Sequence, residues 1–371
     1  MTANLRSSFF IFGMLSWHTG VTMATCAENS PLVNMSFQLD WRFNAQFAGI
    51  FMADASGNMT KAGVNLEIRP WEDGINAIDE VAEGRADFAC AEQNLIIAAQ
   101  AAGSPVKAVA TMFQFSPYGL MAPPDGAVEL TSLEALEGFP VGVHVDGIKV
   151  MELVKGVNGL ADINVTEIHY ADKWDRVVSG EMAAVQCYVI DEPIGVHSNY
   201  GVQPMVLRLS DHGLLSTAQT IVVSEETLES RGDLVTKVLG AIFQGWIVAL
   251  ADKPTAAAII VNDYVPDDSV YKDIAYQTET LELLEPYVLV EGRPIGVIDP
   301  EVWANAAELM LEFGIVNSLP DDLSSTLAIE YYNGPLVFED CNDQSTAGGF
   351  RVVVPSNAFV VAIFLLFQFL C

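Results

Sequence analysis

Residues 34–69 read NMSFQLDWRFNAQFAGIFMADASGNMTKAGVNLEIR, and this stretch determines the expected fold. Its two apolar runs, 34–39 and 64–69, have strand character, and the segment between them, 47–60, carries apolar residues at helical spacing. The same alternation of strands and helices continues to residue 112. Such alternation predicts an α/β fold in which helices cover a largely parallel sheet.

A second unit of alternating strands and helices begins after the turn-forming residues Pro123-Pro124-Asp125-Gly126. The chain then returns through a strand near residue 219 and a long apolar helix. We therefore expect two lobes with mixed, mostly parallel sheets and a cleft between them, because open α/β sheets bind ligands at the carboxyl ends of their strands. The expected boundaries are residues 28–122 for the first part of lobe 1, 123–218 for lobe 2, and 219–340 for the return to lobe 1 with the C-terminal helices.

The charge balance excludes whole classes of partner. Among 371 residues, 17 Lys and Arg stand against 48 Asp and Glu, a formal net charge of −31. This is the reverse of what a nucleic-acid-binding protein needs, so we expect no nucleic-acid partner. The sequence shows no phosphate-binding loop, dinucleotide fingerprint or nucleophile elbow, and its histidines are dispersed. We therefore expect no cofactor and no metal site.

Both ends of the chain have the composition of targeting segments. Residues 1–27 resemble a secretory signal peptide, with Arg6 as the single charge before a short apolar run. Residues 341–371 suit a spacer followed by a hydrophobic glycolipid-anchor signal attached near Ser345, because no basic flank follows the apolar tail. A retained transmembrane tail is the alternative at this end. An acylated Cys26 is the alternative at the other end.

Other features agree with a secretory route. Asn34, Asn58 and Asn164 each begin a sequon for N-glycosylation. Cys26 and Cys341 could form a disulfide in an oxidising lumen, if signal cleavage spares Cys26. We therefore expect an extracellular protein that is held on the cell surface through its C-terminus.

Several motifs, in order along residues 36–316, resemble a known solute-binding family. They are Leu39-Asp40-Trp41, Gly63-Val64-Asn65-Leu66-Glu67-Ile68, Gly84-Arg85-Ala86-Asp87-Phe88, Asp191-Glu192-Pro193, Gly245-Trp246 and Pro294-Ile295-Gly296. The family includes receptors for thiamine-pyrimidine precursors, alkanesulfonate receptors and the fungal thiamine pyrimidine synthase. The resemblance implies a type II periplasmic-binding-protein-like fold, and it implies that bacterial members deliver their ligand to a membrane transporter.

The residues that the synthase needs are missing at the matching positions. Its lysine, which holds pyridoxal phosphate, and its histidine, which is consumed as substrate, correspond to Ala91 and Leu95. Its cysteine-rich iron-binding run falls near residues 213–222, where this chain has no cysteine. Alanine cannot form a Schiff base and leucine offers no imidazole nitrogen. The sequence therefore predicts a binding protein rather than an enzyme.

Two side chains on opposite lobes are the main candidates for ligand binding. Trp41 offers a flat surface for stacking, and Glu192, expected at a strand end, can accept from the amine of an aminopyrimidine. The alternatives are an indole that fills the core of its lobe and a solvated acid. The remaining candidates for the cleft are Asn44, Glu92, Gln93, Ser116, Tyr118 and Tyr188.

These observations predict non-catalytic capture of a small neutral or cationic heteroaromatic ligand, a thiamine-related aminopyrimidine above all. Anionic ligands are disfavoured by the net charge and by the lack of paired basic residues near the expected site. Three alternatives stay open: a thiamine pyrimidine synthase-like protein of thiamine biosynthesis, a receptor for alkanesulfonate or nitrate, and a surface interaction protein that no longer binds ligand.

Overall fold

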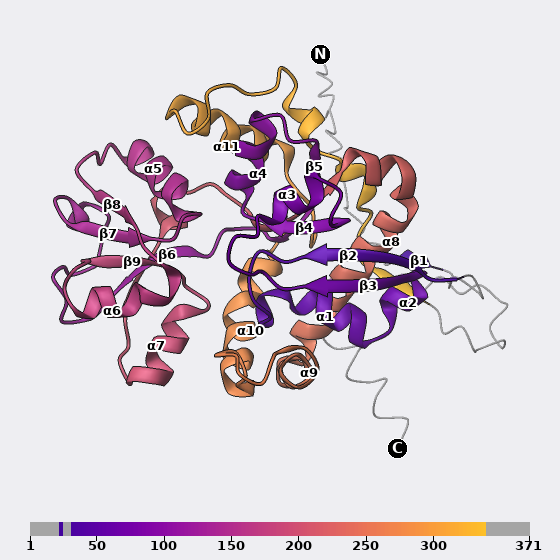
Figure 1. The fold of residues 1–371 in the computed structure, drawn as a ribbon, viewed down its shortest axis with the longest axis horizontal. Coiled ribbons are helices and arrows are strands. Elements are labelled where there is room, and N and C mark those ends of the chain that lie inside the picture. The colour runs from indigo at the N-terminus through magenta and orange to yellow at the C-terminus, as the bar shows by residue number, and fades with distance from the viewer. Residues whose placement is uncertain (1–21, 25–30, 339–371) are drawn as a thin grey trace, which may run out of the picture. The chain divides into compact units, whose positions relative to one another are not determined.

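The computed structural model describes residues 22–24 and 31–338, and two five-stranded sheets organise them (Figure 1). In spatial order, the sheet of lobe 1 contains β3 (Val64–Arg69), β2 (Val33–Gln38), β4 (Phe88–Ala91), β11 (Ala218–Ser224) and β5 (Val106–Phe113). The sheet of lobe 2 contains β10 (Met205–Arg208), β6 (Tyr118–Ala122), β9 (Ala184–Tyr188), β7 (Pro140–Val143) and β8 (Asn164–Glu167). The expected α/β fold with two mixed sheets is confirmed.

Parallel pairings do not predominate in the described sheets, contrary to expectation. β2 runs parallel to β3 and β4, whereas β11 runs antiparallel to β4 and β5. Likewise β7 runs parallel to β8 and β9, whereas β6 runs antiparallel to β9 and β10. The physical reason is that β6 and β11 enter their sheets directly from the other lobe. They therefore lack the crossover helix that makes successive strands parallel.

The first crossing between the lobes comes earlier than predicted. β6 (Tyr118–Ala122) pairs with lobe 2 strands, so the chain leaves lobe 1 through residues 114–117 rather than after residue 122. The turn at Pro123, whose carbonyl accepts from the amide of Gly126, lies inside lobe 2. The longer cluster of turn residues at 123–126 therefore marks a bend within lobe 2, whereas the chain crosses between the lobes at residues 114–117, which carry the shorter turn signal Ser116-Pro117.

Helices pack around each sheet. Lobe 1 carries α1 (Ala48–Ala55), α2 (Asn58–Lys61), α3 (Ala77–Ala82), α4 (Gln93–Ala101), α8 (Glu225–Ala251), α9 (Lys253–Ile259) and α10 (Ile274–Val288). Lobe 2 carries α5 (Gly147–Asn158), α6 (Lys173–Val178) and α7 (Glu192–Tyr200). The last helix, α11 (Pro300–Glu312), contacts α4 of lobe 1 and α5 of lobe 2. All of these elements belong to one compact unit.

Helices α1 and α8 pack backbone against backbone in lobe 1. A Cβ atom added to Gly245 would lie 2.0 Å from the carbonyl oxygen of Gly49, and one added to Gly49 would lie 2.1 Å from Cδ1 of Trp246. Only glycine therefore fits at this crossing. Among the described residues, α8 is also the helix that is long and apolar enough to cross a membrane. Because 61% of its apolar window is buried in the protein, we interpret it as the core helix of lobe 1.

Most predictions about the chain ends fall outside the described residues. These include the anchor at Ser345, the disulfide between Cys26 and Cys341, and the signal segment apart from Thr22–Ala24. Those three residues form β1, which pairs in parallel with β12 (Leu336–Phe338). Of the three sequon asparagines, Asn34 in β2 and Asn164 at the start of β8 are exposed, whereas Asn58 at the start of α2 is half-buried.

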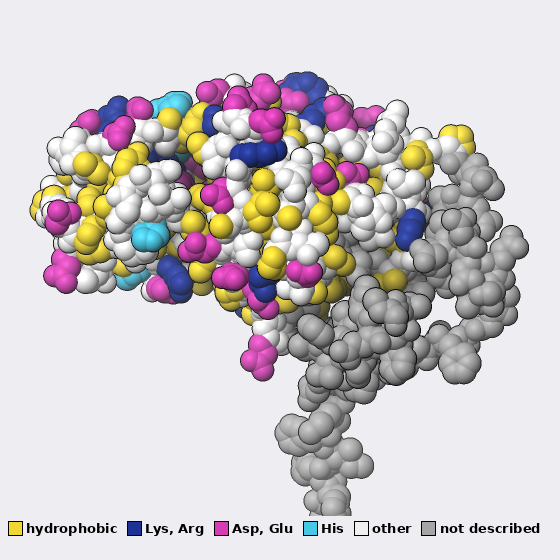
Figure 2. Space-filling model, turned by 90° about the horizontal axis from the view of Figure 1, so that it is seen from below, with side chains coloured by type: hydrophobic (Ala, Val, Ile, Leu, Met, Phe, Trp, Pro, Cys, Tyr) yellow, Lys and Arg dark blue, Asp and Glu magenta, His cyan; other side chains and the backbone are white. Residues whose placement is uncertain are grey.

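The surface reflects the acidic composition. On the face in Figure 2, Asp and Glu side chains are spread over the protein, with Lys and Arg isolated among them. This distribution offers no basic stripe on that face for a polyanion to follow.

Candidate functional site

A cavity of about 730 Å³ lies between the two lobes, and residues at the ends of strands from both sheets line it. Lobe 1 contributes Asp40 and Trp41, which follow β2, and Glu92, which follows β4. Lobe 2 contributes Tyr188 at the end of β9 and Asp146 before α5. The volume is typical of small-molecule sites, and the position at the carboxyl ends of parallel strands is the usual one in α/β proteins.

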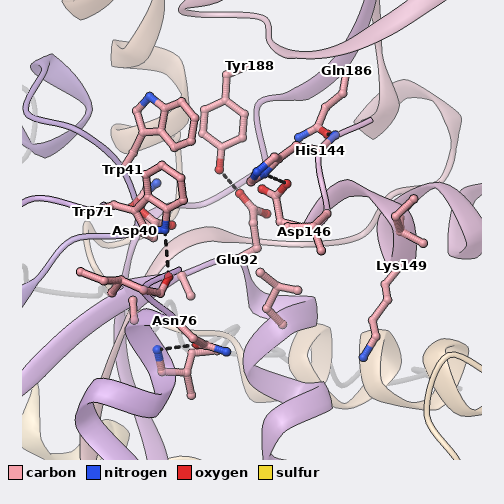
Figure 3. Close-up of a pocket in the computed structure, with 18 of the residues that line it drawn as sticks. Asp40, Trp41, Trp71, Asn76, Glu92, His144, Asp146, Lys149, Gln186 and Tyr188 are labelled. Atoms are coloured by element: carbon pink, nitrogen blue, oxygen red, sulfur yellow. Dashed lines mark hydrogen bonds and ion pairs between the residues drawn. The ribbon is translucent and has the colours of Figure 1, made fainter. Parts of the chain in front are cut away.

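Four rings form an aromatic cluster beside this cavity: Trp41, Trp71, His144 and Tyr170. The indoles of Trp41 and Trp71 stack with centroids 5.2 Å apart, and Tyr170 meets Trp41 edge-on at 5.4 Å. His144 also meets both indoles edge-on. In Figure 3 the indoles lie on one side of the cavity and His144 on the other. Both indoles line the cavity. A flat ligand can therefore stack against the outer face of the indole pair and need not insert between the two rings.

Two carboxyl groups of lobe 1 have raised pKa values. Burial raises the pKa of Asp40 to about 7, against hydrogen bonds from Gln219 and Cys90 that lower it. Burial also raises the pKa of Glu92 well above its ordinary range, although the Tyr188 hydroxyl donates to one of its oxygens and Ser116 to the other at 3.0 Å. Burial therefore disfavours the ionised form of both carboxyl groups.

A third acid of the cavity stays ionised. Burial would raise the pKa of Asp146, but the hydrogen bond and charge of His144, 2.8 Å away, hold it below its usual value. The hydroxyl of Tyr118 donates to its other oxygen at 2.6 Å. The predicted residues Ser116 and Tyr118 do not line the cavity, so the structure places them as positioning residues behind Glu92 and Asp146.

Glu192 lies in the cavity wall, but its environment differs from the prediction. It is the first residue of α7 rather than the end of a strand. One carboxylate oxygen pairs with Nζ of the buried Lys173 at 2.8 Å, and the other accepts from the backbone amide of Tyr188 at 2.6 Å. Glu192 therefore holds the turn between β9 and α7 together. Trp41, Glu92 and Tyr188 also line the cavity, as predicted for their positions.

Two further candidates lie away from the cavity. Asn44 is buried and accepts from the amide of Gln46 at 2.7 Å, which caps the short helix before α1. Gln93 is buried and accepts from the amide of Thr217 at 2.8 Å and from its hydroxyl at 2.9 Å. Asn44 was predicted to contact ligand because it follows Trp41 and matches a polar position of the resembled family, and Gln93 because it lies at a strand-to-helix turn. In the structure they satisfy backbone groups instead.

Sequence reasoning missed several cavity residues. Trp71 follows β3 as Trp41 follows β2, and its amide donates to the carbonyl of Trp41 at 3.0 Å. Two tryptophans after neighbouring parallel strands were a usable signal, because such strands end at one edge of a sheet. Asp40, directly before Trp41, was similarly detectable. Gln186 and Gln219 were not, because nothing in their neighbourhood distinguishes them from ordinary strand residues.

The raised pKa of Asp40 predicts a pH dependence of stability. Unfolded Asp titrates near pH 4, so between about pH 4 and pH 7 the native protein binds a proton at Asp40 that the unfolded chain has released. The free energy of unfolding therefore falls as the pH rises through this window and levels off above it. We expect Asp40→Asn to flatten the decrease, measured by thermal unfolding between pH 5 and pH 8.

The matched control is Asp267→Asn, because the side chain of Asp267 is 99% exposed. This variant should keep the wild-type slope. A D40N protein with the wild-type slope would show that Asp40 does not titrate near pH 7 in the native state.

The described residues contain no group of three His, Cys, Asp or Glu side chains arranged to hold a metal ion. The polar groups of the cavity instead pair with one another across its walls. Such an arrangement can hydrogen-bond a polar heterocycle that stacks on the indoles.

Comparison with known proteins agrees with this geometry. Residues 44–257 match the family model described as NMT1/THI5 like. A riboflavin-binding protein, RibY, of Chloroflexus aurantiacus is 25% identical over 84% of this chain and 90% of its own length. A formylaminopyrimidine-binding protein of Halalkalibacterium halodurans is 22% identical over 75% of this chain and 85% of its own length.

The fold resembles that of a solved solute-binding protein. The periplasmic aliphatic sulphonate-binding protein SsuA of Escherichia coli matches with a TM-score of 0.59 and 15% identity, over 88% of this chain and 98% of that chain. The periplasmic-binding-protein fold expected from the sequence motifs is thereby confirmed. Since the family model covers more than half of its residues, the chain belongs to the NMT1/THI5-like family of solute-binding proteins.

Proposed function

We propose that this protein captures a neutral or cationic nitrogen heteroaromatic, above all an aminopyrimidine related to thiamine, without transforming it. The observation that carries the proposal is the cavity itself, in which the indoles of Trp41 and Trp71 face hydrogen-bonding acids. Stacking on the indoles provides affinity for a flat ring, and the acids orient its nitrogen groups. The formylaminopyrimidine-binding relative supports this choice of ligand.

The charges in the cavity favour the same class of ligand. Lys173 is paired with Glu192, and His144 with Asp146, which leaves the exposed Lys149 as the cationic side chain of the lining without a described ion pair. A sulfonate or nitrate would therefore enter a cavity with several acids and little free positive charge. This electrostatic balance argues against the anion-receptor alternative.

The absence of catalysis is inferred from two cavity positions. Ala91 and Leu95, which correspond to the lysine and histidine of the synthase, both line the cavity. Their side chains offer neither an amine for a cofactor nor an imidazole for the synthase reaction. We infer that the site holds its ligand unchanged.

Riboflavin is the second candidate ligand, and the size of the cavity favours it. A cavity of about 730 Å³ is in the range that accommodates drug-sized molecules, and so exceeds what a single pyrimidine ring needs. A three-ring flavin could also cover more of the indole pair. The riboflavin-binding relative supports this candidate.

A ligand panel tests the proposal. Isothermal titration of the secreted protein against formylaminopyrimidine, hydroxymethylpyrimidine, thiamine, riboflavin and taurine should show micromolar or tighter binding of at least one heteroaromatic. Tight binding of taurine alone would replace the proposal by the anion-receptor function. Binding of none of the five would favour a surface interaction protein that has lost its ligand.

We also propose, from the sequence of the chain ends, that the protein follows the secretory pathway and is anchored at the extracellular side of the cell surface. By analogy with bacterial members of the family, we propose a membrane transporter that receives the ligand as its partner. Release of the protein from intact cells by a phospholipase specific for phosphatidylinositol is the measurement for the glycolipid anchor. A protein that stays with the membrane after this treatment would indicate a retained transmembrane tail.

A further inference from the structure

Gln219 is the residue of the cavity wall whose hydrogen bonding is incomplete. Its side chain is 1% exposed, and its Oε1 atom has no hydrogen-bond partner. Several other buried side-chain atoms in the described residues also lack a partner. Of all these atoms, only Oε1 of Gln219 belongs to a residue that lines the cavity.

The backbone of Gln219 is also unusual. Its φ angle is +51°, and among the described residues it is the one non-glycine residue with a positive φ. Left-handed backbone is unfavourable for a side chain such as glutamine, and it persists where the surroundings impose it. Such residues cluster at ligand-binding sites.

The neighbours of Gln219 explain how this conformation is held. Ala218 pairs with Phe113 of β5, and Thr220 pairs with Thr111 of β5 and with Ala91 of β4. The hydroxyl of Thr220 also lies 2.9 Å from those of Thr111 and Thr217. Gln219 is therefore fixed on both sides, and its side chain is positioned before any ligand arrives.

The other oxygens at this end of the cavity are already engaged. Glu92 accepts from Tyr188 and Ser116, and Asp146 pairs with His144 and Tyr118. A hydrogen bond from the Gln219 side chain lowers the pKa of Asp40, so it is the amide nitrogen of Gln219 that donates to this carboxyl group. The carbonyl oxygen of the same amide is then the acceptor without a partner. A buried carbonyl oxygen without a partner is destabilising unless a ligand satisfies it.

We propose that Gln219 is a specificity-determining residue, whose free carbonyl oxygen accepts a hydrogen bond from an N–H group of the ligand beside Asp40. This inference rests on the proposed capture of a nitrogen heteroaromatic and narrows it to ligands that carry such a donor. An exocyclic amine or a ring N–H meets the requirement. The same ring with its donor nitrogen fully alkylated does not, because it leaves the carbonyl unpaired and adds bulk.

The test compares ligand pairs that differ at the donor. The probes are 4-amino-5-hydroxymethyl-2-methylpyrimidine with its 4-dimethylamino analogue, and riboflavin with 3-methylriboflavin. The variants are Gln219→Leu and Gln219→Gly, of which the glycine variant accepts a positive φ without strain. The control is Gln100→Leu, because Gln100 is also buried with an unpartnered Oε1 but does not line the cavity.

For the pair that binds, we expect the wild type and Q100L to prefer the donor-bearing probe by about tenfold or more, whereas both Gln219 variants bind the two probes within about twofold. If the Gln219 variants keep the wild-type preference, or if the wild type shows no preference, this inference is wrong and the proposed function stands. If the wild type and Q100L bind none of the four probes, this inference is wrong, and the proposed function fails as well if formylaminopyrimidine and thiamine do not bind either.

Discussion

Replacing Trp41 by alanine is expected to weaken binding of the heteroaromatic ligand by about 30-fold or more, which corresponds to about 2 kcal/mol. The indole of Trp41 stacks on Trp71 and meets His144 and Tyr170 edge-on. Removing it therefore deletes one of the two indoles on which the ligand stacks, and also removes ring contacts with His144 and Tyr170 of lobe 2. Titration of the variant with the ligand identified by the panel measures the effect.

Trp41 has a second role that the experiment must separate from stacking. Its Nε1–H donates to the hydroxyl of Tyr271 at 2.8 Å, and that hydroxyl donates to Asp191 of lobe 2 at 3.0 Å. Tyr271→Phe removes both bonds and leaves the indole in place. If stacking dominates, Y271F should lose much less affinity than W41A, and Trp41→Phe should lie between them because it keeps an aromatic face.

Trp174→Phe is the control for a general effect of losing an indole. Trp174 is buried in lobe 2 against Tyr200 and does not line the cavity. This variant should lower the unfolding temperature without changing affinity. If W41A binds ligand as tightly as the wild type, the indole belongs to the packing of lobe 1 alone, which was the alternative interpretation of the sequence.

The fold was predictable from the sequence because its signals are local. The strand at 34–39 corresponds to β2 within one residue, and the helical spacing at 47–60 covers two helices, α1 and α2, which are separated at Gly57. The lobe boundary was not, because the turn signal at residues 123–126 is stronger than the Ser116-Pro117 pair in residues 114–117, where the chain crosses between the lobes. The antiparallel pairing of β11 similarly depends on contacts with β4 and β5, which are distant in sequence.

The residues that line the cavity were predictable only where they lie at the ends of strands. Glu92 follows β4 directly and Trp41 lies shortly after the end of β2, and the sheet brings them to one edge. The role of Glu192 could not be derived in this way, because its partner Lys173 lies in another helix and is buried. Gln219 was missed for a different reason. Its positive φ is imposed by the pairing of its neighbours in β11, and a glutamine in the sequence does not indicate a left-handed backbone.

The pairing of Lys173 with Glu192 predicts the largest effect on stability. The side chain of Lys173 is 7% exposed and that of Glu192 is 27% exposed, with 2.8 Å between Nζ and the carboxylate. The charge of Glu192 holds the pKa of Lys173 above its ordinary value although burial would lower it, so the lysine is protonated at neutral pH. Lys173→Met leaves the carboxylate unpaired beside the buried Asp191, whose pKa is already raised.

We expect K173M to lower the free energy of unfolding by about 3 kcal/mol, measured by urea unfolding at neutral pH, because removal of one partner from a buried ion pair is strongly destabilising. The double variant K173M/E192Q should cost less than the sum of its single changes, with a coupling of about 1–3 kcal/mol. Lys272→Met, which removes a pair to the fully exposed Asp267, should cost about 1 kcal/mol or less.

If K173M and K272M prove equally mild and no coupling is found, then Lys173 does not hold Glu192. The Glu192 carboxylate would in that case be free to accept a hydrogen bond from a ligand amine, as the sequence alone predicted. Glu192 and Gln219 would then both accept from N–H groups of the ligand.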